Sequence, residues 1–511
     1  MNKISKTKSK TTIYLLFTTL LFLIAFILRI YPAIIRPLNA DEAYTIVYLA
    51  KFTKIIDIIN HDPSVPPLQY IFVKFLSNYS TNLLWLRIPS VIFSICTLIF
   101  VFVWIKEVSK KCAFISVLLL TFSNIQISYS WQVYVYSQLC FFGLLSVYFF
   151  YKLYYEKQTN LFYSLGFFVF TIASWFTHYS YFWTFSGIFI LVIISILKMI
   201  QRKRINVQEK YIIFPFILII ISLGLYAPIF INNFGRALIN ISWMQQDINL
   251  FYIGEMLLHA VGLYDLFKIA FLNNNIIYIL IVLITTYILI YQLLYKKHTN
   301  KEKGIIFFVN ILFVSNIIFP LFSSFIFKQN LLAERGLILA SVLFSIQIAF
   351  LLKKLTLNIT GLYFSIFYIF FYIIYSIFIN RTNVQILVNQ EISKYYVEWI
   401  RDNLLNSKRE LNIVLFASEA NPFINARPNK YVIDYYWYGY DGNTPMRDYK
   451  YIDQDNINNY KDKLFFLLVV ENSKKINILE QNTICKHFNK LYEFYEYEEY
   501  YGFGIYECNG G

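Results

Sequence analysis

Long apolar runs of about 20 residues recur along most of this chain, and they constrain its fold more than any other feature. Such a run is long enough to cross the hydrocarbon core of a bilayer as a helix. The composition agrees, because 58% of the 511 residues are hydrophobic and only 15% are charged, whereas soluble domains are about one-quarter charged. We therefore predict a polytopic α-helical membrane protein. Its eleven predicted spans cover 13–35, 88–105, 112–129, 133–151, 161–177, 180–197, 211–231, 276–294, 305–327, 336–352 and 360–379.

The basic residues predict the orientation. The formal net charge is +15, but Lys and Arg cluster in short breaks between apolar runs, so we expect membrane lipids and no nucleic acid as partners. With a cytoplasmic N-terminus and an uncleaved first span, the inner segments hold 20 basic residues and the longer outer loops hold nine. An odd number of spans then predicts an extracytoplasmic C-terminal part in a multi-pass plasma-membrane protein.

The composition changes near residue 381. Two apolar runs beyond that point, 412–416 and 464–470, are too short to span a membrane and are typical of buried strands. Helix-like stretches cover 391–405 and 473–488, and turn-rich polar segments make up the rest. We predict a transmembrane domain over 1–380 and a small external α/β domain over 381–511.

The cysteines suggest no structural metal, because the chain has no CxxC pattern and no Cys/His cluster. Cys485 and Cys508 lie in the predicted external domain, on the oxidising side of the membrane, where a disulfide can form. The sequence leaves open whether these two cysteines pair.

Two adjacent carboxylates, Asp41 and Glu42, follow the first span and begin the long outer loop 36–87. A paired carboxylate can act as a base whose pKa its neighbour raises, or it can bind a cation. Asn39 with Glu42 also fits a capping-box arrangement that only starts a helix. Spacing alone favours this structural role.

The same loop contains two short helix-like pieces, 41–53 and 68–75, which we expect to lie on the membrane surface as interfacial helices. Between them, three prolines within 63–67 stiffen the chain beside His61 and Asp62. These two residues can bind a hydroxyl or a phosphate, or Asp62 can simply bond its own backbone in a turn. The sequence does not favour either alternative.

Aromatic and basic residues mark the other outer breaks. Gln132 and Tyr136 lie in or beside one aromatic break and His178 lies in another, where they form either a membrane-interface belt or a surface for ligand binding. Arg335 opens the tenth span and either anchors it or binds a phosphate in bidentate fashion. Arg29 lies near the outer end of the first span, where it can snorkel or pair with a carboxylate.

Taken in order, these residues resemble a known family. The chain is similar to the RgtA/B/C/D-like group of the GT-C glycosyltransferase superfamily, which is related to protein O-mannosyltransferases and aminoarabinose transferases. The resemblance rests on Asp41-Glu42-Ala43-Tyr44, His61-Asp62-Pro63, Pro66-Pro67-Leu68-Gln69-Tyr70, Leu86-Arg87-Ile88-Pro89-Ser90, Tyr129-Ser130, Tyr136-Ser137, Thr177-His178-Tyr179 and Arg335.

The resemblance implies an inverting glycosyltransferase on the outer face of the membrane. It implies transfer of a sugar from a polyprenyl-phosphate-linked donor to an envelope glycan, lipid or protein acceptor. By the resemblance, Asp41 is the catalytic base with Glu42 beside it, and Arg335 is a phosphate ligand. The expected substrate-binding residues are His61, Asp62, Gln132, Tyr136, His178 and Arg335.

The sequence departs from the family pattern at two positions. Gln132 stands where the family usually has Glu, and Tyr134 stands where it usually has Arg. An amide cannot take a proton or hold a divalent cation strongly, so we assign no metal ligands and leave metal dependence open. A member that binds the donor without catalysis is therefore one alternative.

A flippase or transporter of lipid-linked sugars is the other alternative. Transporters commonly hold ionisable residues midway through broken spans. In this chain the predicted spans are nearly free of acidic residues, and the carboxylates gather in outer loops. This distribution favours chemistry at the membrane surface over transport.

Overall fold

The computed structural model describes residues 2–36, 38, 40–50, 54, 57–59, 66–202, 207–240, 250–261, 285, 299–327, 331–332, 334–356 and 359–388, and five C-terminal strands. The chain forms two compact units. The first comprises Met1–Ile34, Phe52–Val73 and Arg87–Arg381, and the second comprises Ile35–Lys51, Lys74–Leu86 and Thr382–Gly511.

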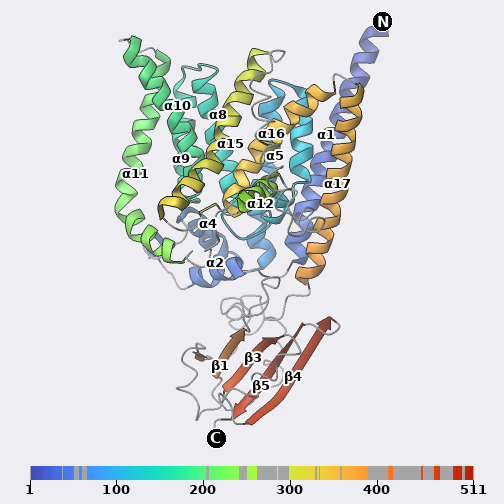
Figure 1. The fold of residues 1–511 in the computed structure, drawn as a ribbon, viewed down its shortest axis with the longest axis vertical. Helices are drawn as coiled ribbons and strands as arrows, with labels where there is room; N and C mark the ends of the chain where they lie inside the picture. The colour runs from blue at the N-terminus through green and yellow to red at the C-terminus, as the bar shows by residue number, and fades with distance from the viewer. Residues whose placement is uncertain are drawn as a thin grey trace. The chain divides into compact units, whose positions relative to one another are not determined.

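The first unit is built from helices that run alongside one another (Figure 1). The helices are α1 (Asn2–Ile35), α4 (Leu68–Ser77), α5 (Leu83–Lys106), α6 (Lys110–Thr121), α7 (Asn124–Ser128), α8 (Tyr136–Tyr154), α9 (Leu161–Trp175), α10 (Tyr181–Arg202), α11 (Val207–Asn240), α12 (Leu250–Val261), α15 (Asn300–Phe327), the 3-10 turn η2 (Glu334–Leu337), α16 (Ile338–Leu355) and α17 (Ile359–Val388). The last residue of α1, the end of α4, the start of α5 and the end of α17 fall within the second unit.

Among the described residues, seven helices are long and apolar enough to cross a membrane. They are Thr12–Ile35, Leu83–Lys106, Tyr181–Arg202, Glu209–Pro228, Asn300–Phe327, Arg335–Leu355 and Ile359–Ile377. The chain is therefore a multi-pass membrane protein, as predicted. The count of eleven spans stays a prediction, and the expected span 276–294 lies outside the described residues except for Thr285.

Helix α16 lies at the centre of the first unit. In its most apolar stretch 83% of the residues are buried, against 22% in α1 and in α17. It packs against α6, α7, α8, α12 and α15. Its small residues Ala340, Ser341, Ser345 and Ala349 let neighbouring backbones approach closely, as interfaces between membrane helices require.

The predicted span 112–129 is not continuous, because the chain breaks between α6 and α7. A break within a membrane leaves carbonyl groups without helical partners. Arg29 of α1 is fully buried and supplies donors to them: Nη2 to the Leu120 carbonyl at 3.0 Å and Nη1 to the Thr121 carbonyl at 3.4 Å. Its Nε donates to Ser94 Oγ at 2.8 Å. Arg29 thus caps a helix end instead of snorkelling or pairing with a carboxylate.

The other side of the same break is held by α17. Ser376 Oγ donates to the Phe122 carbonyl and lies 3.0 Å from Asn124 Oδ1. Side chains from α1 and α17, which come from opposite ends of the first unit's sequence, therefore fix the break together.

Capping side chains set where several helices begin. Ser109 accepts the backbone N–H of Cys112 at the start of α6, and Asn160 accepts that of Phe162 at the start of α9. Thr299 and Glu302 form a reciprocal capping box at the start of α15.

Several predicted inner segments meet at one end of the first unit. Lys152 Nζ lies 2.5 Å from a Glu107 oxygen and 2.8 Å from a Glu156 oxygen, which joins the segments 106–111 and 152–157. The Tyr155 hydroxyl donates to the Asn300 carbonyl at 2.7 Å and so adds the start of α15.

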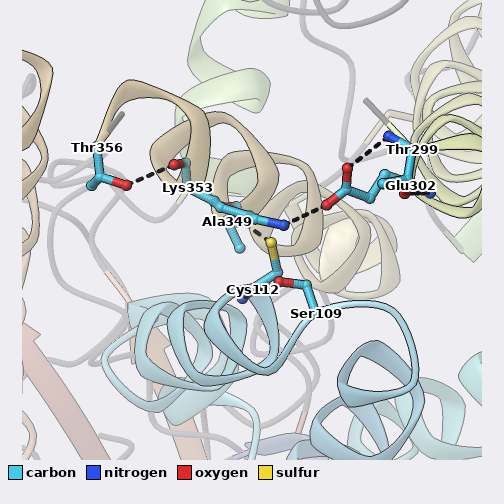
Figure 2. Close-up of polar contacts among 7 residues, drawn as sticks. All are labelled: Ser109, Cys112, Thr299, Glu302, Ala349, Lys353 and Thr356. Atoms are coloured by element: carbon cyan, nitrogen blue, oxygen red, sulfur yellow. Dashed lines mark hydrogen bonds and ion pairs between the residues drawn. The ribbon is translucent and has the colours of Figure 1, made fainter. Parts of the chain in front are cut away.

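The end of α16 joins this group. Figure 2 shows Lys353 reaching Glu302, whose other oxygen accepts the Thr299 backbone N–H, and Thr356 bonding back to the Lys353 carbonyl. Lys111 also donates to Thr356 Oγ1 at 2.5 Å. The charge bias predicted that these segments share one side of the membrane. That this side is cytoplasmic stays a prediction.

The second unit contains α2 (Ala40–Ala50) and a five-stranded sheet in the order β2-β1-β3-β5-β4 (Figure 1). The strands are β1 (Asn412–Ala417), β2 (Lys450–Ile452), β3 (Phe465–Glu471), β4 (His487–Tyr497) and β5 (Tyr501–Asn509). Strand β1 pairs in parallel with β2 and β3, and β5 pairs antiparallel with β3 and β4.

Both strands predicted beyond residue 381 are confirmed, as β1 and β3. The helices of the predicted α/β domain lie outside the described residues, and so does Cys485, so the α/β assignment and the pairing with Cys508 stay predictions. The two helix-like pieces of the first outer loop are helical, as α2 and α4. Their position at the membrane surface also stays a prediction.

We expect Arg29→Met to destabilise the protein by about 1–3 kcal/mol, because the Thr121 carbonyl loses its donor and the Leu120 carbonyl keeps only the Ser123 N–H at 3.4 Å. The unfolding midpoint in detergent measures the change. Ile27→Met, at a half-exposed position of the same helix, is the matched control and should leave the midpoint nearly unchanged. Equal midpoints for both variants would contradict the capping role.

Candidate functional site

The segment between α7 and α8 is anchored on α5. The buried Arg87 donates from Nη1 to the Ala33 carbonyl at 3.0 Å, and its guanidinium carbon lies 4.6 Å from the centre of the Trp131 ring. Ser90 Oγ donates to the Gln132 backbone carbonyl at 2.6 Å. Arg87 and Ser90 are three residues apart and share a helix face. The stretch 86–90 therefore holds this loop at two residues, Trp131 and Gln132.

Gln132 has a structural bond that the acid usual in the family could not make. Its Nε2 donates to the carbonyl of Ser128, the last residue of α7, at 3.0 Å. A carboxylate only accepts hydrogen bonds, so Glu at this position would leave the carbonyl unsatisfied. The amide thus caps α7. Substrate binding by Gln132 stays a prediction.

Aromatic rings gather where this loop meets α8. Tyr136 is almost fully buried, and its ring centre lies 4.6 Å from that of Tyr129 and 5.0 Å from that of Tyr134. The ring centre of His178 is 5.8 Å away. Ser137 Oγ donates to the Tyr129 carbonyl at 3.0 Å, which folds the loop back onto the start of α8.

His178 lies in the turn between α9 and α10. The turn is tied to α4 because the Leu68 N–H donates to the Phe176 carbonyl at 2.9 Å. Ser180 donates to His178 Nδ1 from its backbone N–H at 3.1 Å. Burial by surrounding protein, together with the positive charge of Arg335, lowers the pKa of His178 to about 4. The ring is therefore neutral at pH 7.

Arg335 lies in η2, directly before the central helix α16. A Cβ added to the next residue, Gly336, would stand 3.7 Å from Ser180 Cβ, so η2 runs close beside the His178 turn. Tyr252 of α12 donates to the Leu332 carbonyl and holds the preceding chain. Arg335 is partly exposed. The first unit thus brings together Tyr136, His178 and Arg335 from three separate turns.

The two predicted catalytic carboxylates differ in environment. Both lie in the first turn of α2, in the second unit. Glu42 is fully buried, whereas Asp41 is partly exposed, and the Asp41 backbone carbonyl accepts the Thr45 hydroxyl at 2.8 Å. Asp41 is therefore the more exposed of the two carboxylates, and the catalytic role of either stays a prediction. Asn39, His61 and Asp62 lie outside the described residues.

Sequence reasoning missed two supports of the site. Arg87 and Ser90 entered only as part of a family resemblance, although their three-residue spacing could have indicated a shared contact. Tyr181 was not singled out. Its hydroxyl lies 2.6 Å from Ser146 Oγ, which is 2.6 Å from Thr171 Oγ1, so three hydroxyls link α8, α9 and α10 close to the His178 turn.

Metal ligands do not cluster in the described part of the chain. Within it, no three His, Cys, Asp or Glu side chains lie close enough to hold an ion. The position where the family usually has Glu carries Gln132, whose amide nitrogen is already bonded. Metal dependence of the chain stays an open prediction.

We expect Gln132→Glu to destabilise the protein by about 1–3 kcal/mol, because the Ser128 carbonyl loses its donor and faces a carboxylate. The unfolding midpoint in detergent checks the change. Gln158→Glu, in an exposed break at the opposite end of α8, is the control. A Gln132→Glu variant as stable as this control would contradict the capping role.

Comparison with known proteins was made by sequence and by structure. No protein-family model matches the sequence, and no curated protein matches it. The crystal structure of ArnT from Cupriavidus metallidurans bound to undecaprenyl phosphate aligns with a TM-score of 0.55 at 8% identity, over 97% of this chain and 98% of that one. The apo state of the same protein aligns with a TM-score of 0.47, at the same identity and coverage. The chain thus has a fold similar to that of ArnT, a GT-C glycosyltransferase.

Proposed function

We propose that this chain is a membrane glycosyltransferase that moves a sugar from a polyprenyl-phosphate-linked donor to a glycan, lipid or protein acceptor on the outer face of the membrane. The observation that carries the proposal is the meeting of Tyr136, His178 and Arg335 at three turns of a bundle with an ArnT-like fold. That fold, in ArnT, accommodates undecaprenyl phosphate.

Arg335 is the proposed ligand of the donor phosphate. A guanidinium offers a rigid fork of donors that matches phosphate oxygens, and its charge stabilises the phosphate as it leaves. Arg335 is partly exposed and precedes a helix that is mostly apolar until Lys353. This position suits a headgroup at the bilayer surface with its lipid tail among apolar helices.

Tyr129 and Tyr134, which pack on the buried ring of Tyr136, are the proposed surface for the sugar. Both are partly exposed, and their ring centres lie 4.6 Å and 5.0 Å from that of Tyr136. Aromatic faces pack against the C–H faces of a sugar, while phenolic hydroxyls bond its hydroxyls. The charge on Arg335 makes this region better suited to a neutral sugar than to a cationic one.

Asp41 is the proposed base. The acceptor oxygen forms a bond to the anomeric carbon while the bond from that carbon to the phosphate oxygen breaks. The acceptor proton passes to the Asp41 carboxylate, and the bonding electrons leave with the phosphate. Attack from the face opposite the phosphate inverts the anomeric centre. The partial exposure of Asp41 supports this assignment over Glu42.

We expect Asp41→Asn to lower transfer by about 10²–10⁴-fold, since the amide cannot accept the proton. Membranes from expressing cells, supplied with labelled polyprenyl-phosphate sugars, measure the loss of label from the donor. Asp57→Asn, in the same outer loop, is the control and should transfer normally. Near-normal transfer by a well-expressed Asp41→Asn variant would rule out the base assignment.

We expect Arg335→Ala to weaken binding of undecaprenyl phosphate by about 10–100-fold, the value of a charge-assisted hydrogen bond. Arg335→Lys keeps the positive charge but loses the forked set of donors, so its affinity for undecaprenyl phosphate should lie between those of wild type and Arg335→Ala. Lys301→Ala, at the opposite end of the unit, is the control for lost charge. An unchanged dissociation constant for Arg335→Ala would argue against phosphate binding there.

The assay with labelled polyprenyl-phosphate sugars also distinguishes a transferase from a flippase. A transferase moves the label onto an acceptor, so it leaves the polyprenyl-phosphate pool. A flippase moves the lipid across the bilayer while the label stays on polyprenyl phosphate. Label that crosses without changing its carrier would replace the proposed function with transport.

A further inference from the structure

His178 is held in one tautomer by the residue two positions on. Its Nδ1 accepts the Ser180 backbone N–H at 3.1 Å and lies 2.7 Å from Ser180 Oγ. A backbone N–H can only donate, so Nδ1 must carry a lone pair. In a neutral imidazole the proton then sits on Nε2.

The charge state agrees with this tautomer. Desolvation and the positive charge of Arg335 both disfavour the imidazolium and lower the pKa of His178 to about 4. Protonating Nδ1 would also cost the hydrogen bond from Ser180. A ring in this state makes a poor base near neutral pH, because its free nitrogen is already bonded.

The Nε2–H group is available to a ligand. Among the described residues no hydrogen bond reaches Nε2, and this atom is not one of the buried polar atoms that lack a partner. The residue as a whole is of intermediate exposure, although protein atoms surround its ring closely enough to lower its pKa. The buried Tyr136 ring, 5.8 Å away and tilted by 53°, packs beside it. His178 therefore presents one fixed donor.

The Nε2–H of His178 and the guanidinium of Arg335 together favour a ligand group that only accepts hydrogen bonds. Arg335 only donates hydrogen bonds, and His178 in this tautomer only donates through Nε2. A phosphate oxygen only accepts, whereas a sugar hydroxyl both donates and accepts. The positive charge that disfavours the imidazolium also attracts an anion to the same place.

We propose that His178 binds the phosphate of the lipid donor through a fixed Nε2–H, sharing that anion with Arg335, and that it takes no part as a base. This inference rests on the proposed function. It assigns His178 to the leaving phosphate, not to the sugar or the acceptor. Its imidazole positions the phosphate while Arg335 supplies the charge.

Binding of undecaprenyl phosphate by the full-length protein in detergent tests the assignment. His178→Leu should weaken binding by about 10-fold or more, the value of a hydrogen bond to a charged group. His178→Gln, which keeps a neutral N–H at nearly the same place, should stay within about 3-fold of wild type. Phe182→Leu, at an exposed position in the first turn of α10, is the control.

A comparison of undecaprenyl phosphate with undecaprenol tests whether His178 contacts the phosphate. The neutral alcohol undecaprenol should bind His178→Leu as well as it binds wild type. Equal loss of the phosphate and of the alcohol would overturn the assignment, as would unchanged phosphate binding in His178→Leu. The pH profile of transfer in His178→Gln should match that of wild type, and loss of a limb of that profile would show that His178 titrates as a base.

A spectroscopic readout is independent of activity. The chain has five histidines, so ¹⁵N-histidine spectra of wild type and His178→Gln identify the His178 signals by difference. At pH 7 we expect an unprotonated Nδ1 and a protonated Nε2. The opposite tautomer or an imidazolium would overturn the inference even if wild type binds the lipid. Failure of wild type to bind the lipid phosphate would overturn the proposed function as well.

Discussion

Backbone groups that leave a helix within the bilayer need partners, and in this chain side chains from distant helices supply them. Arg29 and Ser376 close the break between α6 and α7 from two sides. The short α7 leads directly into the loop that carries Trp131 and Tyr129. The position of that loop, and therefore of the aromatic region, depends in part on the buried guanidinium of Arg29.

In the candidate site, too, hydrogen bonds from neighbouring residues hold backbone groups that lie outside the helices. Its residues stand on short turns, and a backbone or side-chain hydrogen bond pins each turn to a neighbour. Ser90 holds the loop before α8, Leu68 holds the turn before α10, and Tyr252 holds the chain before η2. These bonds from neighbouring residues fix the turns that carry Tyr136, His178 and Arg335.

Much of the bundle could be predicted from the sequence, because apolar length decides which segments span a bilayer and basic residues decide which ends meet. The break within 112–129 could not, since residues on either side are apolar and the partners of the break lie far away in sequence. Resemblance predicted His178 and Arg335 as site residues, but only the fold brings their two turns close together. The unequal burial of Asp41 and Glu42 also depends on packing that adjacency in sequence does not reveal.

The partners of Arg29 have a consequence for biosynthesis. Ser94 and Leu120 follow it by 65 and 91 residues, so α1 is synthesised long before them. Until then the guanidinium can bond only the Ala25 carbonyl of its own helix, at 3.1 Å, and its other donors have no protein partner. The final placement of α1 therefore depends on α5 and α6 as well. Membrane insertion and packing of the first three long segments are coupled through a single side chain.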